Sequence, residues 1–569
     1  MDSEIRESRT LTVVALACAL VIGLPFLNKP IHIDDTFVLA VSEQIRRDPL
    51  RPFGSYRPED AKQREEMLKR GEPLSPSWAP LDWFHDPDPI FDITTNPPFL
   101  SYWLAPVLAA FGPSEIALHL AMLPFLILLA LAAASLSKRF AQGSVWPVLF
   151  VLFSPAVVVS PNLMRDVPAA ALATAAVALF IAGTDRDQWL YAIVGAALAG
   201  LAMVTKYSAL IVLPVLALYP LLRGKPRFLA ALLPAAAILG LWYLQNYLVN
   251  GQIHFFVMRS KEKASIDKVN MATAGLVITG ASFLLAPGLL AHAIRRRDWL
   301  SPLGAVVVAA ATLLFLRRHY PGQCSFQYYL WAILGAVLIY WVVVAGLFAG
   351  GRWWKRPVEP AALDSLFLLV WLIGPYLCGV LFVEFPAVRH ILPAAAPIAL
   401  IAARYAQRTI APPSRWVAGA FGIGLAAQAI LAFWTAAADY QYADTYRRFA
   451  REDFKKMGIS TAGQIWFNGH WGWKHYALEA GFRHVTEHGP DFPKPGDLMI
   501  VPDICHRGNL PPGLQERLEQ IAEKRYPARL DLVTMDWVRA SFYATFGTTT
   551  PAYFIQGADY EVFRVFRVK

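Results

Sequence analysis

Long apolar runs dominate this sequence. Leu-, Ala- and Val-rich stretches recur about thirteen times, and each approaches the roughly 20 residues that a helix needs to cross a hydrocarbon layer about 30 Å thick. A large soluble helical protein would need polar helix faces, which these stretches lack. Because 56% of the residues are hydrophobic and only 17% are charged, we predict an α-helical polytopic membrane protein. The predicted spans lie near residues 11–28, 115–137, 145–160, 167–184, 188–204, 207–222, 227–248, 272–294, 299–316, 327–349, 361–383, 390–404 and 414–436.

Basic residues in the short loops predict the orientation, because cytoplasmic loops carry an excess of Lys and Arg. If the N-terminus is cytoplasmic, the even-numbered gaps between spans face the cytoplasm. These gaps hold Lys138-Arg139, Arg186, Arg223 with Lys225 and Arg227, Arg295-Arg296-Arg297, Arg352 with Lys355 and Arg356, and Arg404 with Arg408. The net charge of +10 then indicates topology and contact with anionic membrane lipids, and it does not imply nucleic acid. We expect a multi-pass protein of the inner (cytoplasmic) membrane.

Two regions outside the apolar runs predict the division into domains. Residues 1–437 are expected to form the transmembrane domain, including a folded first extracytoplasmic loop at 30–97. Residues 98–111 are apolar but short, which predicts an interfacial or re-entrant helix. Residues 438–569 alternate strand and helix signals, so we predict a soluble extracytoplasmic α/β domain. Its predicted strands are 463–467, 497–501, 530–535 and 560–568, and its predicted helices are 473–480 and 514–524.

Charged residues flank the predicted spans on the outer side. They are Asp34, Asp35, Arg165, Asp166, Lys206, Arg317, Arg318, His319, Arg389 and His390. Basic residues at the outer face run against the orientation rule, and a buried or interfacial anion would explain them. Carboxylates beside cations suit a reaction in which a carboxylate takes a proton from an acceptor hydroxyl while cations hold a phosphate leaving group.

Simpler explanations exist for each of these residues. Asp34 and Asp35 are able to cap a helix that begins at Thr36, because Asp is a favoured N-cap residue. Asp166 precedes Pro168 and is also a plausible helix start. Lys206 and Arg389 are long enough to extend to lipid headgroups.

Five segments in the same order resemble motifs of the GT-C glycosyltransferases, specifically the family of protein mannosyltransferases and aminoarabinose transferases that use polyprenyl-phosphate sugars. The segments are Ile33-Asp34-Asp35-Thr36, Asn96-Pro97-Pro98-Phe99-Leu100-Ser101-Tyr102-Trp103, Arg165-Asp166-Val167-Pro168, Thr205-Lys206-Tyr207 and Arg389-His390-Ile391-Leu392-Pro393. The resemblance implies a GT-C-like membrane fold. It also implies that the Asp34-Asp35 pair supplies the catalytic carboxylate.

The same resemblance assigns roles to the other motif residues. It implies that Asp166 shapes the acceptor site, and that Lys206, Arg389 and His390 hold the phosphate of the lipid donor. We add Arg165 to the phosphate ligands, and we expect Asn96 and Tyr102 to contact the acceptor or the sugar. Some relatives carry Glu-Lys before the double proline, where this chain has Thr95-Asn96. A metal bridge built on that Glu is therefore not supported.

The sequence does not predict a specific cofactor. A divalent metal at His85, Asp86 and Asp88 is conceivable, but Asp86-Pro87-Asp88-Pro89 is also typical of a turn. The predicted function is a transferase that moves one sugar from a polyprenyl-phosphate carrier to a hydroxyl of a lipid, glycan or protein in the periplasm or cell envelope. A transporter or flippase of lipid-linked sugars is the alternative, although the sequence lacks the inverted repeats and midplane charges of transporters. An oligosaccharide ligase is a further alternative.

The predicted orientation is tested with reporters fused to the C-terminus. Alkaline phosphatase there is expected to be active, and a reporter that requires the cytoplasm is expected to be inactive. The opposite result would place Asp34 and Lys206 on the cytoplasmic side and would exclude a site at the outer face.

Overall fold

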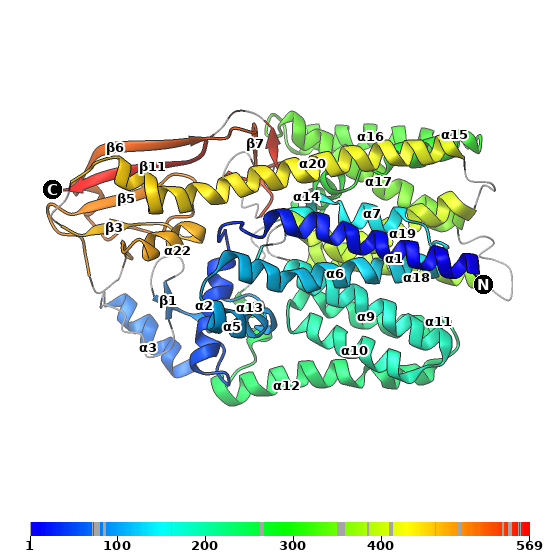
Figure 1. The fold of residues 1–569 in the computed structure, drawn as a ribbon, viewed down its shortest axis with the longest axis horizontal. Coiled ribbons are helices and arrows are strands. Elements are labelled where there is room, and N and C mark those ends of the chain that lie inside the picture. Colours follow the sequence, from blue (N-terminus) through cyan, green and yellow to red (C-terminus); the bar gives the residue numbers. More distant parts are fainter. Residues whose placement is uncertain are drawn as a thin grey trace.

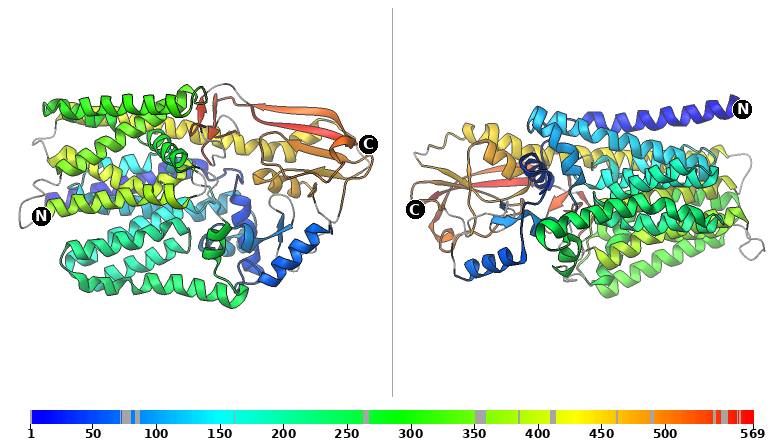
Figure 2. Two further views of the ribbon diagram at one scale, coloured as in Figure 1. Left: turned by 180° about the vertical axis from the view of Figure 1, so that it is seen from behind. Right: turned by 90° about the horizontal axis from the view of Figure 1, so that it is seen from below.

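The computed structural model describes the chain except residues 1, 71, 73–79, 83–86, 161, 262–266, 350–358, 384–385, 409–413, 461–462, 488–490, 537–539, 544–548, 556 and 558. Long helices run side by side along the longest axis, and a C-terminal sheet lies at the end opposite to the N-terminus (Figure 1). Figure 2 shows the same division from behind and from below. Within the described residues, eight helices are long and apolar enough to cross a membrane, or nine if one bent pair is a single span. The chain is a multi-pass membrane protein.

The long helices are α1 (Asp2–Gly23), α6 (Glu115–Phe140), α9 (Asp166–Arg186), α12 (Leu233–Asn250), α16 (Leu300–His319), α17 (Phe326–Ala349), α18 (Pro360–Phe382) and α20 (Arg415–Arg448). The bent pair is α14 (Lys268–Ser282) and α15 (Ala286–Arg295), which meet at 80°. Shorter helices and 3₁₀ turns complete this part: η1 (Leu24–Phe26), α5 (Phe99–Phe111), α7 (Trp146–Leu152), α8 (Pro155–Val158), α10 (Trp189–Met203), η2 (Tyr207–Ile211), α11 (Val212–Leu222), η3 (Pro226–Leu232), α13 (His254–Lys261), η4 (Val388–Ile391) and α19 (Leu392–Arg408).

Every apolar run that the sequence predicts contains helix, but several of these helices are shorter than a span. Residues 145–160 form α7 and α8, because the chain breaks at Ser154, whose side chain caps α8, and Pro155 follows as its first residue. Residues 272–294 bend between α14 and α15. Helix α10 has only 15 residues. The long-range pattern of apolar runs predicts where helices form, and local caps and prolines decide how long each one is.

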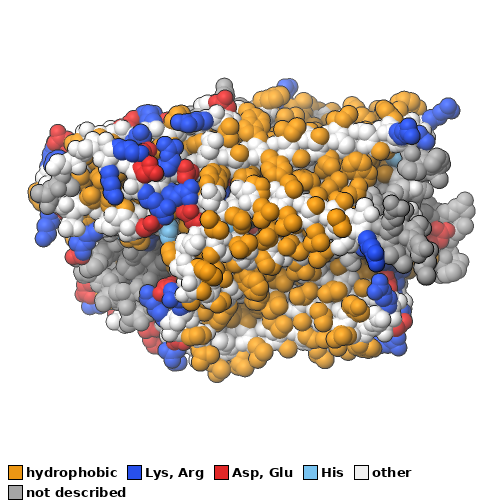
Figure 3. Space-filling view, in the orientation of Figure 1, with side chains coloured by type: hydrophobic (Ala, Val, Ile, Leu, Met, Phe, Trp, Pro, Cys, Tyr) orange, Lys and Arg blue, Asp and Glu red, His pale blue; other side chains and the backbone are white. Residues whose placement is uncertain are grey.

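Apolar side chains face outward along the helical part. Figure 3 shows them covering this region, with most Lys, Arg, Asp and Glu at its two ends. Helix α16 is an extreme case, because Leu300 is 79% and Val306 64% exposed. Such a surface suits contact with lipid chains.

Small residues let neighbouring helices approach closely. A Cβ atom on Gly280 of α14 would lie 2.1 Å from the carbonyl oxygen of Trp331 in α17, and a Cβ on Gly335 of α17 would lie 1.8 Å from the carbonyl oxygen of Leu276. In α9 and α10, Gly183 and Gly195 make similar close approaches. Because lipid is as apolar as Leu, close packing of this kind drives association of helices in membranes.

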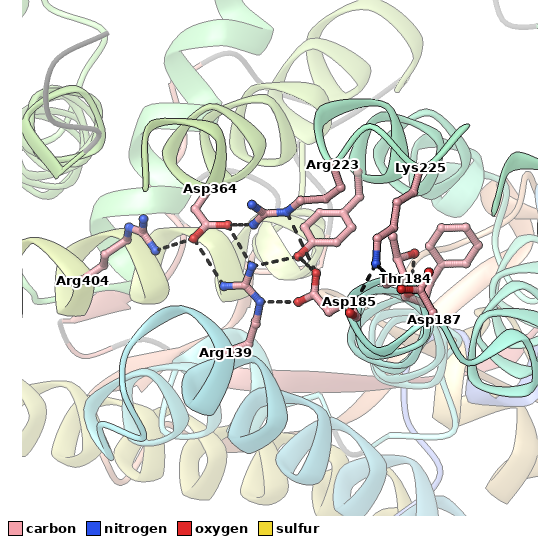
Figure 4. Close-up of polar contacts among 10 residues, drawn as sticks. Arg139, Thr184, Asp185, Asp187, Arg223, Lys225, Asp364 and Arg404 are labelled. Atoms are coloured by element: carbon pink, nitrogen blue, oxygen red, sulfur yellow. Dashed lines mark hydrogen bonds and ion pairs between the residues drawn. The ribbon is translucent and has the colours of Figure 1, made fainter. Parts of the chain in front are cut away.

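A network of ion pairs joins helix ends on the side away from the sheet (Figure 4). Asp364 of α18 accepts hydrogen bonds from Arg139 of α6 (3.2 and 3.3 Å), from Arg404 of α19 (3.3 Å) and from Arg223. Arg139 also donates to Asp185 at 2.5 Å. These arginines come from separate loops that the sequence predicts to be cytoplasmic. Part of their charge is therefore balanced within the protein instead of being offered to lipid headgroups.

The first loop folds on the side nearest to the sheet. It contains α2 (Asp35–Arg47), α3 (Pro58–Lys69), the paired strands β1 (Pro80–Asp82) and β2 (Pro87–Pro89), and α4 (Ile90–Ile93). The predicted short helix at 98–111 is observed as α5. The Ser101 hydroxyl of α5 donates to the carbonyl of Val38 at 3.1 Å, which ties α5 to α2.

The C-terminal region contains a five-stranded mixed sheet in the order β4-β3-β5-β11-β6. Strand β3 is parallel to β4 and β5, and β11 is antiparallel to β5 and β6. Its elements are η5 (Phe449–Asp453), α21 (Phe454–Lys456), β3 (Ile465–Phe467), α22 (Trp471–Glu479), β4 (Arg483–His484), β5 (Leu498–Pro502), η6 (Gln515–Arg517), β6 (Leu518–Pro527) and β11 (Asp559–Val568). Short strands β7 (Leu532–Val533) and β10 (Phe554–Ile555) pair with each other, as do β8 (Met535–Asp536) and β9 (Ala540–Ser541).

The predicted helix at 514–524 is wrong. Residues 518–527 form strand β6, which pairs with β11 along most of its length. The local sequence is rich in Leu, Glu, Gln and Lys, which favour helix, but pairing with the buried strand β11 overrides this weak preference. The predicted strands at 463–467, 497–501 and 560–568 agree with β3, β5 and β11.

Candidate active site

The charged motif residues meet at the end of the helices nearest to the sheet. Asp34 precedes α2, Arg165 and Asp166 begin α9, Lys206 precedes η2, and Arg389 lies in η4. Each of them lies where a helix begins or where the chain turns between helices. Short turns between apolar helices therefore bring five residues from distant parts of the sequence to one place.

Asp166 forms the centre of this group. Its side chain is 5% exposed, Lys206 Nζ contacts its Oδ1, and Arg389 Nε lies 3.3 Å from its Oδ2. The side chains of Lys206 and Arg389 are only 15% and 8% exposed. These two cations thus bind a buried carboxylate and do not extend to the membrane surface. Both carboxylate oxygens of Asp166 are therefore paired with these cations.

Asp34 is the accessible carboxylate. Its side chain is 41% exposed, and its Oδ2 lies 3.9 Å from Arg389 Nη2. It occupies the N-cap position of α2 but makes no capping hydrogen bond with its side chain. Desolvation by the surrounding protein raises the pKa of Asp34 above its ordinary value, although Arg389 and Arg165 act in the opposite direction. A raised pKa brings a carboxylate closer to the range that suits a general base.

Asp35 has a different environment. It is fully buried, and its Oδ2 accepts a hydrogen bond from the backbone N–H of His32 at 2.9 Å. Burial raises the pKa of Asp35 to about 8. Ile33, two residues before Asp35, has a φ of +42°, which is unusual for a β-branched residue and marks a constrained turn. The turn therefore buries Asp35 and leaves Asp34 accessible.

Arg165 retains unused hydrogen-bond donors. Among the described residues, its buried Nε and Nη2 atoms have no hydrogen-bond partner. Its guanidinium lies over the ring of Phe37, 5.4 Å from the ring centroid, which holds the side chain in place. A buried guanidinium with unused donors is suited to bind an anion.

An apolar pocket opens beside η4. It lies between α14 and α18, and its lining includes His390, which follows Arg389 in the sequence. Its apolar lining includes Met271, Ile278, Tyr376 and Val380. The pocket therefore provides an apolar surface next to the charged group.

Asn96 and Tyr102 lie apart from the carboxylates. Asn96 donates to the Thr95 hydroxyl at 2.8 Å, and the Tyr102 hydroxyl donates to the carbonyl of Pro49 at 2.6 Å. Within the described part of the chain, neither side chain has a hydrogen bond to Asp34, Asp166 or the cations around them. Their motif still contributes to the site, because the Phe99 N–H donates to the carbonyl of Val204 near Lys206 at 3.1 Å.

Two groups of supporting residues were not predicted from the sequence. Tyr207 bonds to His254 at 2.9 Å and to Trp242 at 3.0 Å, and His254 bonds to the Thr94 carbonyl, which fixes the turn at Lys206. A second group is centred on Asp439 of α20, which pairs with Lys29 at 2.5 Å. Lone charged residues at the ends of apolar runs, such as Lys29 and Asp439, are the signal that could have identified this group.

No group of three His, Cys, Asp or Glu residues in the described ranges could hold a metal ion. His85 and Asp86 lie outside the described residues, as does the side chain of Asp88.

No family model matches the chain, and no curated protein matches it. Among solved structures, it is similar to ArnT from Cupriavidus metallidurans in the apo state, with 15% identity over 97% of both chains and a TM-score of 0.41. The structure of that protein bound to undecaprenyl phosphate has 15% identity over 97% of both chains and a TM-score of 0.39. The arabinosyltransferase EmbB from Mycobacterium smegmatis has 14% identity, covers 76% of this chain and 42% of its own, and has a TM-score of 0.31.

Proposed function

We propose that the chain is an inverting membrane glycosyltransferase that moves one sugar from a polyprenyl-phosphate donor to an acceptor hydroxyl. The observation that carries this proposal is an accessible carboxylate, Asp34, beside buried cations at one end of a membrane-spanning bundle. In the orientation predicted from the loops, this end faces the outside of the inner membrane. The acceptor is a lipid, glycan or protein of the cell envelope.

Asp34 acts as the general base in this reaction. It takes the proton of the acceptor hydroxyl while the hydroxyl oxygen attacks the anomeric carbon of the sugar. The bond between that carbon and the phosphate oxygen breaks, and the electron pair leaves on the phosphate. A single displacement of this kind inverts the configuration at the anomeric carbon. The reaction needs no covalent intermediate with the protein.

The three cations have different roles. Arg165 has buried donors without partners and receives the phosphate directly. Lys206 and Arg389 are held by Asp166, so their positions are set before the donor arrives. Such preorganised charge stabilises the negative charge that develops on the leaving phosphate.

The prenyl chain of the donor has a place in the apolar pocket between α14 and α18. His390, which follows Arg389 in the sequence, lines the pocket, and most of the other lining residues are apolar. A lipid that lies there presents its phosphate to the charged group while its tail stays among apolar side chains.

Asp34→Asn is expected to lower turnover at least about 100-fold, because the amide cannot accept the proton. Asn has nearly the same shape and remains a good N-cap residue, so folding and donor binding are expected to persist. Single-sugar transfer and thermal stability are measured with purified protein in detergent.

Asp35→Asn is the matched control for this substitution. Burial favours the neutral form of Asp35, which Asn mimics, so turnover is expected to stay close to that of the wild type. Full activity in Asp34→Asn, Asp35→Asn and the double variant would refute the carboxylate mechanism and favour a transporter of lipid-linked sugars.

Arg165→Ala, Lys206→Ala and Arg389→Ala are each expected to raise KM for the lipid donor about 10-fold or more, since charge-assisted hydrogen bonds contribute roughly 1.5–3 kcal/mol. Arg318→Ala is the control, because Arg318 is an exposed basic residue at the end of α16. Donor KM is measured at saturating acceptor. Equal effects of Arg318→Ala and Arg165→Ala would indicate a general effect of surface charge.

Gly379→Trp is expected to block the lipid chain. A Cβ atom at Gly379 meets no atom within 4 Å, and the residue lines the pocket, so a large side chain there fills it. Gly419→Trp in α20 is the control, because its Cβ also meets nothing within 4 Å but Gly419 does not line the pocket. We expect weaker donor binding in the first variant alone. Unchanged donor binding in Gly379→Trp would place the prenyl chain elsewhere.

A further inference from the structure

The C-terminal region reaches back into the group of charged motif residues. The Val388 N–H donates to the carbonyl of Phe542 at 3.0 Å, and Arg389 Nη1 donates to the carbonyl of Tyr543 at 2.7 Å. Phe542 and Tyr543 are 0% and 2% exposed. A segment more than a hundred residues beyond the last predicted span therefore packs directly against the element that carries Arg389.

Tyr543 uses both its backbone and its side chain at this place. While its carbonyl accepts from Arg389, its hydroxyl donates to Asp439 Oδ2 at 2.6 Å and accepts from Asn162 Nδ2 at 2.8 Å. Asn162 lies three residues before Arg165. The one residue thus contacts the η4 element, the turn that leads into α9, and helix α20.

Asp439 extends these contacts to the turn that carries Asp34. Besides Tyr543, it binds Lys29 Nζ at 2.5 Å and the Thr534 hydroxyl at 2.6 Å, and His32 Nε2 lies 3.4 Å from its Oδ1. Asp439, His32 and Lys29 are 0%, 0% and 2% exposed. A buried carboxylate needs such partners, because an unpaired charge in a dry interior is costly.

Helix α22 of the C-terminal sheet region holds the same turn from another side. The Ile31 N–H donates to the Tyr476 hydroxyl at 2.8 Å, and that hydroxyl donates to Glu115 at 2.6 Å. A Cβ atom on Gly472 would lie 2.1 Å from the carbonyl oxygen of Ile31, so the two backbones are in close contact. The position of Asp34 is therefore coupled to the C-terminal region through Ile31 and His32.

We propose that Tyr543 and Asp439 are positioning residues of the transfer site, and that the C-terminal region is a working part of that site. The Tyr543 carbonyl sets the direction of the Arg389 guanidinium, and the hydroxyl contacts to Asp439 and Asn162 set the direction of that carbonyl. This inference rests on the proposed function, because it assigns to Arg389 the role of a donor-phosphate ligand. Neither Tyr543 nor Asp439 touches the reacting atoms.

The test compares two conservative substitutions in the same segment. Tyr543→Phe removes the hydroxyl that contacts Asp439 and Asn162. Tyr553→Phe is the matched control, because Tyr553 is also fully buried and its hydroxyl donates to the carbonyl of Ala281 at 2.7 Å, a different partner from those of the Tyr543 hydroxyl. Binding of undecaprenyl phosphate to the full chain in detergent is measured together with thermal stability and donor KM.

Both variants are expected to lose thermal stability. Only Tyr543→Phe is expected to weaken undecaprenyl phosphate binding and to raise donor KM, each by about 10-fold, because neighbouring residues in one hydrogen-bond network are energetically coupled. In an Arg389→Ala background, Tyr543→Phe is expected to cause no further loss of binding, because the group that it positions is gone. Asn162→Ala, which removes the other contact of the hydroxyl, is expected to reproduce the effect, and it decides the question if Tyr543→Phe does not fold.

The outcomes separate this inference from the proposed function. If the wild-type chain neither binds undecaprenyl phosphate nor transfers a sugar, the proposed function fails. If it does both and Tyr543→Phe or Asn162→Ala binds the lipid as tightly as the wild type, the positioning role is refuted while the proposed function stands. Additive effects of Tyr543→Phe and Arg389→Ala would also refute the positioning role.

Discussion

The pairing of Asp166 with Lys206 and Arg389 is the interaction on which the end of the bundle nearest to the sheet depends. These residues come from the start of α9, the turn before η2 and the η4 element. A buried charge costs several kcal/mol unless opposite charges and hydrogen bonds compensate it, so the loss of any partner leaves the others unsatisfied. The three segments can therefore move apart only at a high cost in free energy. Arg389, which this pairing holds, lies beside Asp34.

The two ends of the bundle use charge in different ways. Helix α9 begins at Asp166 and ends at Arg186, so the two clusters of ion pairs lie about 30 Å apart along one helix. At the end away from the sheet, Asp364 is surrounded by three arginines that all donate to it, which joins helix ends. At the other end, Arg165 keeps buried donors without partners, and Asp34 remains accessible. The Asp364 cluster therefore stabilises the packing of helix ends, whereas the group with Arg165 and Asp34 has the features of a binding site. Between them, small residues such as Gly280 and Gly335 provide the packing.

The helices and the group of charges around Asp166 could be predicted from the sequence because their signals are local. An apolar run marks a helix wherever it occurs, and alternation of the loops assigns Asp34, Arg165, Lys206 and Arg389 to one end. The helix predicted at 514–524 failed because pairing with β11, a contact distant in sequence, decided the structure of that segment. The Asp439 group was missed for a similar reason, since Lys29 and Asp439 are 410 residues apart and neither belongs to a motif. Which of two adjacent carboxylates is accessible depends on the turn at Ile33, and no local pattern encodes that.

The charges around Asp34 and Asp166 match the proposed reaction both before and after the sugar is transferred. Burial favours the neutral forms of Asp35 and His390. The cations Arg165, Lys206 and Arg389 then exceed the ionised carboxylates Asp34 and Asp166 by one charge. A polyprenyl-phosphate sugar is a phosphodiester with one negative charge, which this excess balances. When the sugar leaves, the phosphate gains a second negative charge, and Asp34 becomes neutral because it has taken the acceptor proton. The protein's excess of positive charge thereby rises to two, which balances the two negative charges of the released phosphate. Neither the start nor the end of the transfer therefore requires an uncompensated charge in this largely buried site.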